Sequence, residues 1–105
     1  MNVGQEAFYC CTSLMEVSLP RGLKYIDRSA FNYCTALKKV TLPVGMLHIG
    51  FRAFRECKDL REIYIPASVG FIGEEAFYGC KKLTIVCEKG SYAERYAKEH
   101  QIKVK

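Results

Sequence analysis

A period of 23 residues runs through the chain and constrains its fold more than any other feature. Five positions recur at this step: a branched apolar residue, a phenylalanine, a cysteine, a leucine and a second branched residue. The recurring positions are Val3, Ile26, Ile49 and Ile72; Phe8, Phe31, Phe54 and Phe77; Cys11, Cys34, Cys57 and Cys80; Leu14, Leu37, Leu60 and Leu83; and Val17, Val40, Ile63 and Val86. A fixed period of this length is the signature of a solenoid, in which each repeat forms one coil stacked on the next.

Within each repeat, the pattern Leu-x-x-Val-x-Leu-Pro predicts a short strand. In the second repeat, Val40 and Leu42 should face the interior, while Lys39 and Thr41 face solvent. Pro43 ends the strand because proline has no amide to donate to a ladder. The Ala-Phe-x-x-Cys stretch has apolar residues three apart and predicts a single helical or 3₁₀ turn. Strands of successive repeats should pair in parallel about 4.8 Å apart, so that equivalent side chains form columns in a shared interior.

The repeat pattern changes near the C-terminus. Glu88 and Lys89 occupy the places where an apolar residue and a proline would be expected. Ser91-x-x-Glu94 is a capping-box pattern, and the apolar stripe after it predicts a helix from about Tyr92 to His100, followed by a short extended tail. We therefore assign residues 1–90 to the solenoid and 91–105 to a helical cap and tail. The repeats span approximately residues 3–25, 26–48, 49–71 and 72–90.

The N-terminal repeat has no comparable cap before Val3. Its apolar side chains are therefore expected to face solvent beside an unpaired strand edge. These side chains are Phe8, Leu14, Val17 and Leu19. Because terminal repeats need capping, we expect either that the chain is part of a longer array or that this repeat associates end to end with another copy.

Four of the six cysteines follow the repeat, and their spacing favours a column of buried thiols. Neighbouring coils would bring their Cα atoms within disulfide range. However, a column that rises about 4.8 Å per coil extends too far to surround one tetrahedral zinc ion. Cys87 aligns with the outward positions of Ser18, Thr41 and Tyr64, which makes it the candidate for a reactive thiol.

No catalytic residue, cofactor site or metal site is predicted. His48 and His100 have no periodic partner with which to form a catalytic pair, and no glycine-rich phosphate loop is present. The formal charge is +5, but the series Glu16, Lys39 and Glu62 on adjacent strands indicates charge pairing within the sheet and not nucleic-acid binding. No apolar run approaches the roughly 18 residues of a membrane span, and the first residues do not resemble a secretory signal.

The exposed strand face is the candidate surface for a protein partner, because repeat proteins bind partners on such extended faces. Tyr64 next to Arg61 is a combination enriched at interfaces, and Thr84 continues the column of Arg61. The face comprises Met15, Glu16, Ser18, Lys38, Lys39, Thr41, Arg61, Glu62, Tyr64 and Cys87. A second stripe, Tyr25, His48 and Phe71, precedes the isoleucine column and fits either a second binding surface or simple packing.

The repeat resembles that of the BspA-like leucine-rich repeat proteins, also described as the Treponema-type class. The segment Ile72-Gly73-Glu74-Glu75-Ala76-Phe77-Tyr78-Gly79-Cys80 is close to that family's consensus. The resemblance implies an α/β solenoid of four leucine-rich repeats, acting as a non-enzymatic protein-interaction module. It also implies a bacterial surface or secreted protein of the adhesion type, a localisation that the chain itself does not encode. The alternative is a structural spacer without a ligand of its own.

Overall fold

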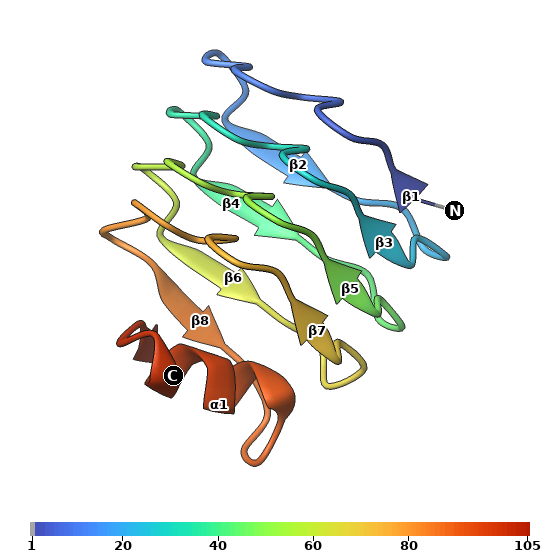
Figure 1. Ribbon diagram of the computed structural model, residues 1–105, viewed down its shortest axis with the longest axis vertical. Coiled ribbons are helices and arrows are strands. Elements are labelled where there is room, and N and C mark those ends of the chain that lie inside the picture. The colour runs from blue at the N-terminus through green and yellow to red at the C-terminus, as the bar shows by residue number, and fades with distance from the viewer. Residues whose placement is uncertain (1) are drawn as a thin grey trace.

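Each coil contributes two short strands, and a computed structural model, which describes residues 2–105, arranges them in two parallel sheets (Figure 1). The wider sheet contains, in spatial order, β2 (Glu16–Ser18), β4 (Lys39–Thr41), β6 (Glu62–Tyr64), β8 (Thr84–Val86) and β9 (Lys103–Val104). The narrower sheet contains β1 (Asn2–Val3), β3 (Tyr25–Ile26), β5 (His48–Ile49) and β7 (Phe71–Ile72). The predicted solenoid of stacked parallel strands is confirmed, whereas the second strand in each coil was not predicted.

The predicted side-chain columns fill the space between the two sheets. The rings of Phe8, Phe31, Phe54 and Phe77 stack in order, with centroids 5.0, 5.2 and 5.4 Å apart and planes within 6° of parallel. The isoleucine and leucine columns are buried beside them in the second and third coils. The side chain of Val3 lies outside the described part of the structure, so its place in the isoleucine column stays a prediction.

The first coil is less exposed than predicted. Phe8, Leu14, Val17 and Leu19 are half-buried, because one side of each packs against the second coil. Within residues 2–105, β2 pairs with β4 alone and β1 pairs with β3 alone.

The Ala-Phe-x-x-Cys stretches are not helical turns, contrary to the prediction. Residues such as Ser29 and Tyr33 adopt left-handed conformations (φ 54° and 64°), which interrupt any continuous helical backbone. As a result, the amide of Asn32 bonds within its own turn, while those of Phe31 and Tyr33 donate to carbonyl oxygens of the next coil, each at 2.8 Å. A helix would direct all of these amides along its own axis, so the turns exchange helical hydrogen bonds for a ladder between coils.

Two glycines allow the coils to approach closely at the end of the narrower sheet. A Cβ atom on Gly50 would lie 2.8 Å from the carbonyl oxygen of Ile26, and one on Gly73 would lie 2.6 Å from the backbone nitrogen of Phe51. In both cases the obstacle is backbone of the preceding coil, which cannot swing aside as a side chain can. The glycines therefore fix the distance between coils.

The fourth coil is one residue shorter between its leucine and its strand, which contradicts the uniform 23-residue alignment. Ile63 pairs with Ile85 and Tyr64 pairs with Val86, so Ile85 and not Val86 enters the core. The uniform alignment would have turned Glu88 inward. The shorter coil leaves Glu88 exposed, which avoids the large cost of burying an unpaired carboxylate.

The predicted C-terminal helix is present as α1 (Tyr92–Glu99), and it lies against the last coil (Figure 1). The Ser91 hydroxyl accepts a hydrogen bond from the Glu94 amide at 3.2 Å, and the Glu94 carboxylate accepts one from the Gly90 amide at 2.8 Å. The buried Tyr96 ring contacts Phe77 edge to face at 6.2 Å. The predicted extended tail forms β9, which adds a strand to the wider sheet beyond β8.

Candidate binding surface

The outward face of the wider sheet collects nine of the ten residues predicted for the main binding surface. In β2, β4 and β6 the middle residue points inward and its two neighbours point to solvent. The nine exposed residues on or immediately before these strands are Met15, Glu16, Ser18, Lys38, Lys39, Thr41, Arg61, Glu62 and Tyr64. Because the strands are in register, the side chains of three coils form one continuous surface.

Cys87 does not belong to this surface, and its predicted alignment with Ser18, Thr41 and Tyr64 is wrong. The shorter fourth coil puts Val86 opposite Tyr64, so Cys87 follows at the inward position and packs half-buried against the core. Burial raises the pKa of the Cys87 thiol, which lowers the fraction of reactive thiolate. Thr84 shifts in the same way and lies opposite Glu62, not next to Arg61 in the column.

The charged residues on the face are in the predicted register but not paired as predicted. Lys39 lies between Glu16 and Glu62 on the adjacent strands. The Glu62 carboxylate nevertheless accepts a hydrogen bond from Lys105, in the tail after β9, at an N–O distance of 3.2 Å. Among residues 2–105, no carboxylate lies within 4.0 Å of the charged groups of Lys38, Lys39 or Arg61.

A hollow of about 360 Å³ opens on this face. It lies over β4 and β6, and Val86 of β8 completes its wall. The side chains around it include Lys38, Arg61 and Tyr64, the last of which is 44% exposed. Lys39 and Glu62 also line it, so the hollow combines an aromatic surface with three cations that lack an ion-pair partner in the described residues and one carboxylate that is paired with Lys105.

The second predicted stripe, Tyr25, His48 and Phe71, lies on the outer surface of the narrower sheet. The His48 ring lies 5.8 Å from Tyr25 and 4.6 Å from Phe71. Tyr25 is 45% exposed and Phe71 is 49% exposed, so these rings form a surface ladder and are not packed beside the isoleucines in the interior.

The cysteine column consists of free thiols in the structure. The Sγ atoms of Cys34, Cys57 and Cys80 donate hydrogen bonds to phenylalanine carbonyls of the preceding coil at 3.0 to 3.2 Å. Burial raises the pKa of Cys34 to about 11, and the neighbouring Cys80 thiol together with burial raises that of Cys57 further. The thiols of Cys34 and Cys57 are therefore neutral hydrogen-bond donors between coils at physiological pH, which agrees with a structural column.

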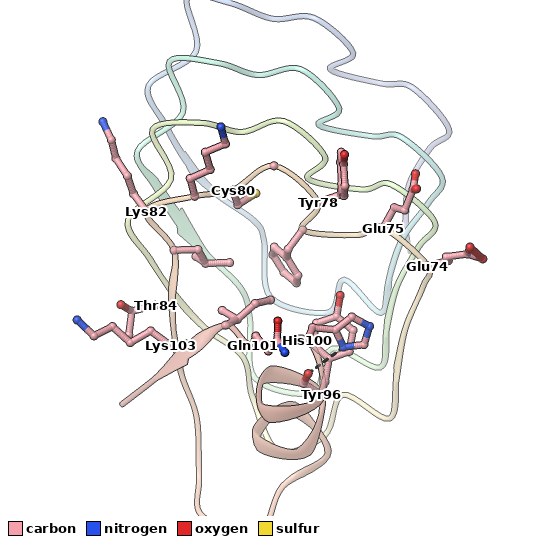
Figure 2. Close-up of a pocket in the computed structure, with 15 residues that line it drawn as sticks. Glu74, Glu75, Tyr78, Cys80, Lys82, Thr84, Tyr96, His100, Gln101 and Lys103 are labelled. Carbon is pink, nitrogen blue, oxygen red and sulfur yellow. Dashed lines mark hydrogen bonds between the residues drawn. The ribbon is translucent and has the colours of Figure 1, made fainter.

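A larger groove, of about 750 Å³, lies between the turn of the fourth coil and the C-terminal segment (Figure 2). Cys80 and His100 both line this groove. The sequence did not suggest this combination, because the repeat pattern does not show which turn the C-terminal helix packs against. Both groups are engaged elsewhere: the Cys80 thiol donates to the Phe54 carbonyl, and His100 Nδ1 lies 2.9 Å from the Tyr96 carbonyl oxygen. The His100 ring also stacks on Tyr96 at 4.0 Å. This geometry supports a structural role for both residues.

The comparisons with known proteins agree with this architecture. Residues 1–93 match the family described as the BspA type leucine rich repeat region (6 copies). The chain belongs to the BspA-type leucine-rich repeat family.

Two solved structures of bacterial leucine-rich repeat proteins support the fold. A leucine-rich repeat protein from Bacteroides ovatus is 39% identical, with a TM-score of 0.86 over 99% of this chain and 27% of that protein. The leucine-rich repeat protein of Treponema pallidum is 29% identical, with a TM-score of 0.59 over 81% of this chain and 51% of that protein. The chain thus spans about a quarter of the first structure and half of the second. No curated protein matches the chain significantly.

BspA-type and other leucine-rich repeats are generally protein-interaction modules and generally non-enzymatic, and BspA-type proteins are often surface-associated. Within residues 2–105, no helix has the length and apolar character needed to cross a bilayer. The same residues contain no group of three histidine, cysteine or acidic side chains placed to hold a metal ion.

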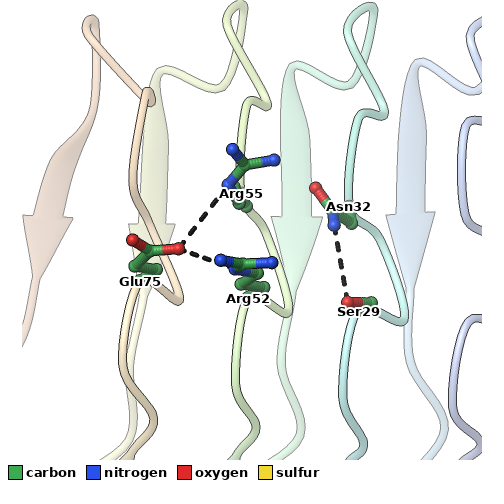
Figure 3. A network of polar contacts seen from close by, with 5 residues as sticks. All are labelled: Ser29, Asn32, Arg52, Arg55 and Glu75. Atoms are coloured by element: carbon green, nitrogen blue, oxygen red, sulfur yellow. Dashed lines mark hydrogen bonds and ion pairs between the residues drawn. The ribbon is translucent and has the colours of Figure 1, made fainter.

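The convex side of this BspA-type solenoid carries a cluster that sequence reasoning missed. The Arg55 guanidinium lies between the rings of Tyr33 and Tyr78, at 5.3 and 5.6 Å. Glu75 bridges Arg52 and Arg55 at 2.6 and 3.7 Å, and the neighbouring Asn32 side chain donates to the Ser29 hydroxyl (Figure 3). Tyr33 and Tyr78 occupy different positions of the repeat, so periodicity gives no signal that they face one arginine. The cluster joins successive turns by cation–π contacts.

Proposed function

We propose that this chain is a non-enzymatic protein-interaction module, part of a bacterial surface or secreted adhesion-type protein, whose partner docks on the outward face of the wider sheet. The observation that supports this best is the hollow next to the exposed Tyr64, on a face that three coils build in register. Partly exposed tyrosines and arginines around a depression are the residue types that dominate binding energy at protein interfaces.

The surroundings of the potential nucleophiles and bases support a non-enzymatic role. The column thiols donate to backbone carbonyls. His48 stacks on Phe71 and lies tilted against Tyr25, and His100 stacks on Tyr96. Nucleophilic catalysis needs a base within hydrogen-bond reach of a nucleophile, and no such pair is formed by the histidines and cysteines of the described residues.

The proposal is tested by affinity capture from extracts of the source organism with three immobilised baits. The baits are the unmodified chain, the face variant Arg61→Ala/Tyr64→Ala, and the control Lys58→Ala/Tyr78→Ala. The control removes one cation and one tyrosine, both exposed, from the turns instead of the strand face. Circular dichroism and thermal unfolding of all three baits establish that each remains folded.

We expect the same protein to be retained by the unmodified chain and by the control, and to be lost from the face variant. Equal retention by the face variant would place the interaction elsewhere on the molecule. Failure of the folded, unmodified chain to retain any protein would support a spacer without a ligand and contradict the proposal.

A further inference from the structure

The cations on the wider sheet outnumber its carboxylates. The outward face, together with the edge strand β9 and the residue after it, carries Lys38, Lys39, Arg61, Lys103 and Lys105, against Glu16 and Glu62. This imbalance concentrates on one face much of the chain's formal charge of +5. A surface with an excess of one sign attracts a partner of the opposite sign and repels one of the same sign.

Internal ion pairing leaves the cations around the hollow without partners. Lys105 pairs with Glu62, and on the adjacent turn Lys82 pairs with Asp59, each at 3.2 Å. Three basic side chains line the hollow, Lys38, Lys39 and Arg61, and none of them has an ion pair among the described residues. The one carboxylate among the lining residues, that of Glu62, is paired with Lys105. All three are exposed, so a bound carboxylate could reach Lys38 and Arg61 without a large desolvation cost.

The hollow also has an apolar component. Tyr64 is 44% exposed, and the half-buried Val86 and the edge of Leu42 lie in the same depression. Sites for whole small molecules span about 300–1,000 Å³, so a hollow of about 360 Å³ has room for one or two side chains. A ring packed on Tyr64 would gain contact area that a purely ionic partner does not offer.

We infer that the partner presents an acidic protein segment with an aromatic side chain, which packs on Tyr64 while carboxylates pair with Lys38 and Arg61. This inference rests on the proposed function, because it names the partner chemistry of the same face. Nucleic acid is a poorer fit, since Glu16 and Glu62 interrupt the basic surface at strand spacing and would repel consecutive phosphates.

The test uses fluorescein-labelled peptides of equal length and fluorescence anisotropy. The first peptide alternates Glu with Phe, and its matched forms replace Glu by Gln, Glu by Lys, or Phe by Gly. A single-stranded oligo(dT) serves as the nucleic-acid probe. Each is titrated with the unmodified chain at about 0.01 M and 0.15 M ionic strength, where the Debye length falls from about 30 Å to about 8 Å.

Two folded charge variants complete the design. Lys38→Glu/Arg61→Glu reverses the charge at the hollow, and the control Lys24→Glu/Lys89→Glu makes the same change in net charge at exposed positions outside the face. We expect the Glu/Phe peptide to bind the unmodified chain more tightly than every matched form and to weaken at the higher ionic strength. Its affinity should fall about tenfold or more in the hollow variant and less than about threefold in the control.

Several results would overturn the inference. Equal binding of the Gln and Glu peptides would show that charge has no role. Equal losses of affinity for the Glu/Phe peptide in both charge variants would show that only net charge matters. Tighter binding of oligo(dT) would identify nucleic acid as the better ligand. Failure of all peptides to bind would also overturn it. In each case the proposed function is judged separately, because the capture experiment with Arg61→Ala/Tyr64→Ala depends on no assumption about the partner's charge.

Discussion

Replacing Phe54 by alanine should destabilise the protein more than any change at an exposed ring, because Phe54 is fully buried at the centre of the phenylalanine column. Its ring stacks on Phe31 at 5.2 Å and on Phe77 at 5.4 Å, with interplanar angles of 2° and 3°. Phe→Ala changes in protein cores cost about 3–5 kcal/mol. Stacked aromatic pairs add about 0.5–1.5 kcal/mol each beyond burial, so the loss of two pairs places Phe54→Ala near the upper end, about 5 kcal/mol.

This cost is large compared with the expected stability of a chain of this length. At about 0.05–0.15 kcal/mol per residue, the free energy of unfolding is about 5–15 kcal/mol. Urea denaturation followed by circular dichroism measures the change. With a slope of about 2 kcal/mol per molar urea, a loss of 5 kcal/mol lowers the midpoint by about 2.5 M.

Phe71→Ala is the matched control, since it removes the same side chain from a position that is 49% exposed. Only about half of the free energy of burying a phenylalanine side chain can be lost at this position, so the free energy of unfolding should fall by about 1.5 kcal/mol or less. If Phe54→Ala cost no more than Phe71→Ala, the phenylalanines would not form a shared interior column, and the reasoning from the repeat to the solenoid would be refuted.

Three further predictions concern stability. Gly50→Ala should lower the free energy of unfolding by about 1–3 kcal/mol, because its Cβ atom would meet backbone 2.8 Å away. Gly70→Ala should be nearly neutral, because its Cβ atom would have no atom within 4 Å, and the urea midpoints of the two variants test this difference. Ser91→Ala should lower the unfolding free energy by about 0.5–2 kcal/mol through loss of the bond to the Glu94 amide, while Ser91→Asp should retain most of it; equal losses would contradict a capping role. The contribution of Cys34 to the free energy of unfolding should be complete below about pH 9 and be lost as the pH rises toward its folded pKa of about 11, because the thiol ionises at a lower pH in the unfolded chain. Denaturation curves measured across this pH range should show that the free energy of unfolding declines less steeply with pH for Cys34→Ala than for the unmodified chain.

The sequence predicts the coil and its columns because every coil must bury the same side chains against its neighbours. This constraint repeats Phe31 as Phe54 and Cys34 as Cys57, and makes the interior readable from spacing alone. The turns are less readable. Left-handed Ser29 and Tyr33 are not glycines, and their conformations follow from hydrogen bonds to the next coil, which a pattern within one repeat does not contain.

The candidate site is predictable in three of its four strands. Strand alternation places Lys39, Glu62 and Tyr64 outward, and the structure agrees. In the fourth strand, Ile85 and Val86 are both branched and apolar, so alternation fits either register, and only the cost of turning Glu88 inward decides between them. The error at Cys87 follows from this ambiguity. The two-residue strands of the narrower sheet are too short to show a period.

Chemical-shift mapping tests most directly whether the wider sheet is the docking face. Amide spectra of the ¹⁵N-labelled chain would be recorded during titration with the captured partner or, if it binds, the Glu/Phe peptide. We predict that the perturbed amides cluster in β4 (Lys39–Thr41), β6 (Glu62–Tyr64) and the adjoining Lys38 and Arg61, while those of β3, β5 and β7 stay unchanged. Perturbations confined to the narrower sheet or to the convex turns around Arg55 would contradict the account.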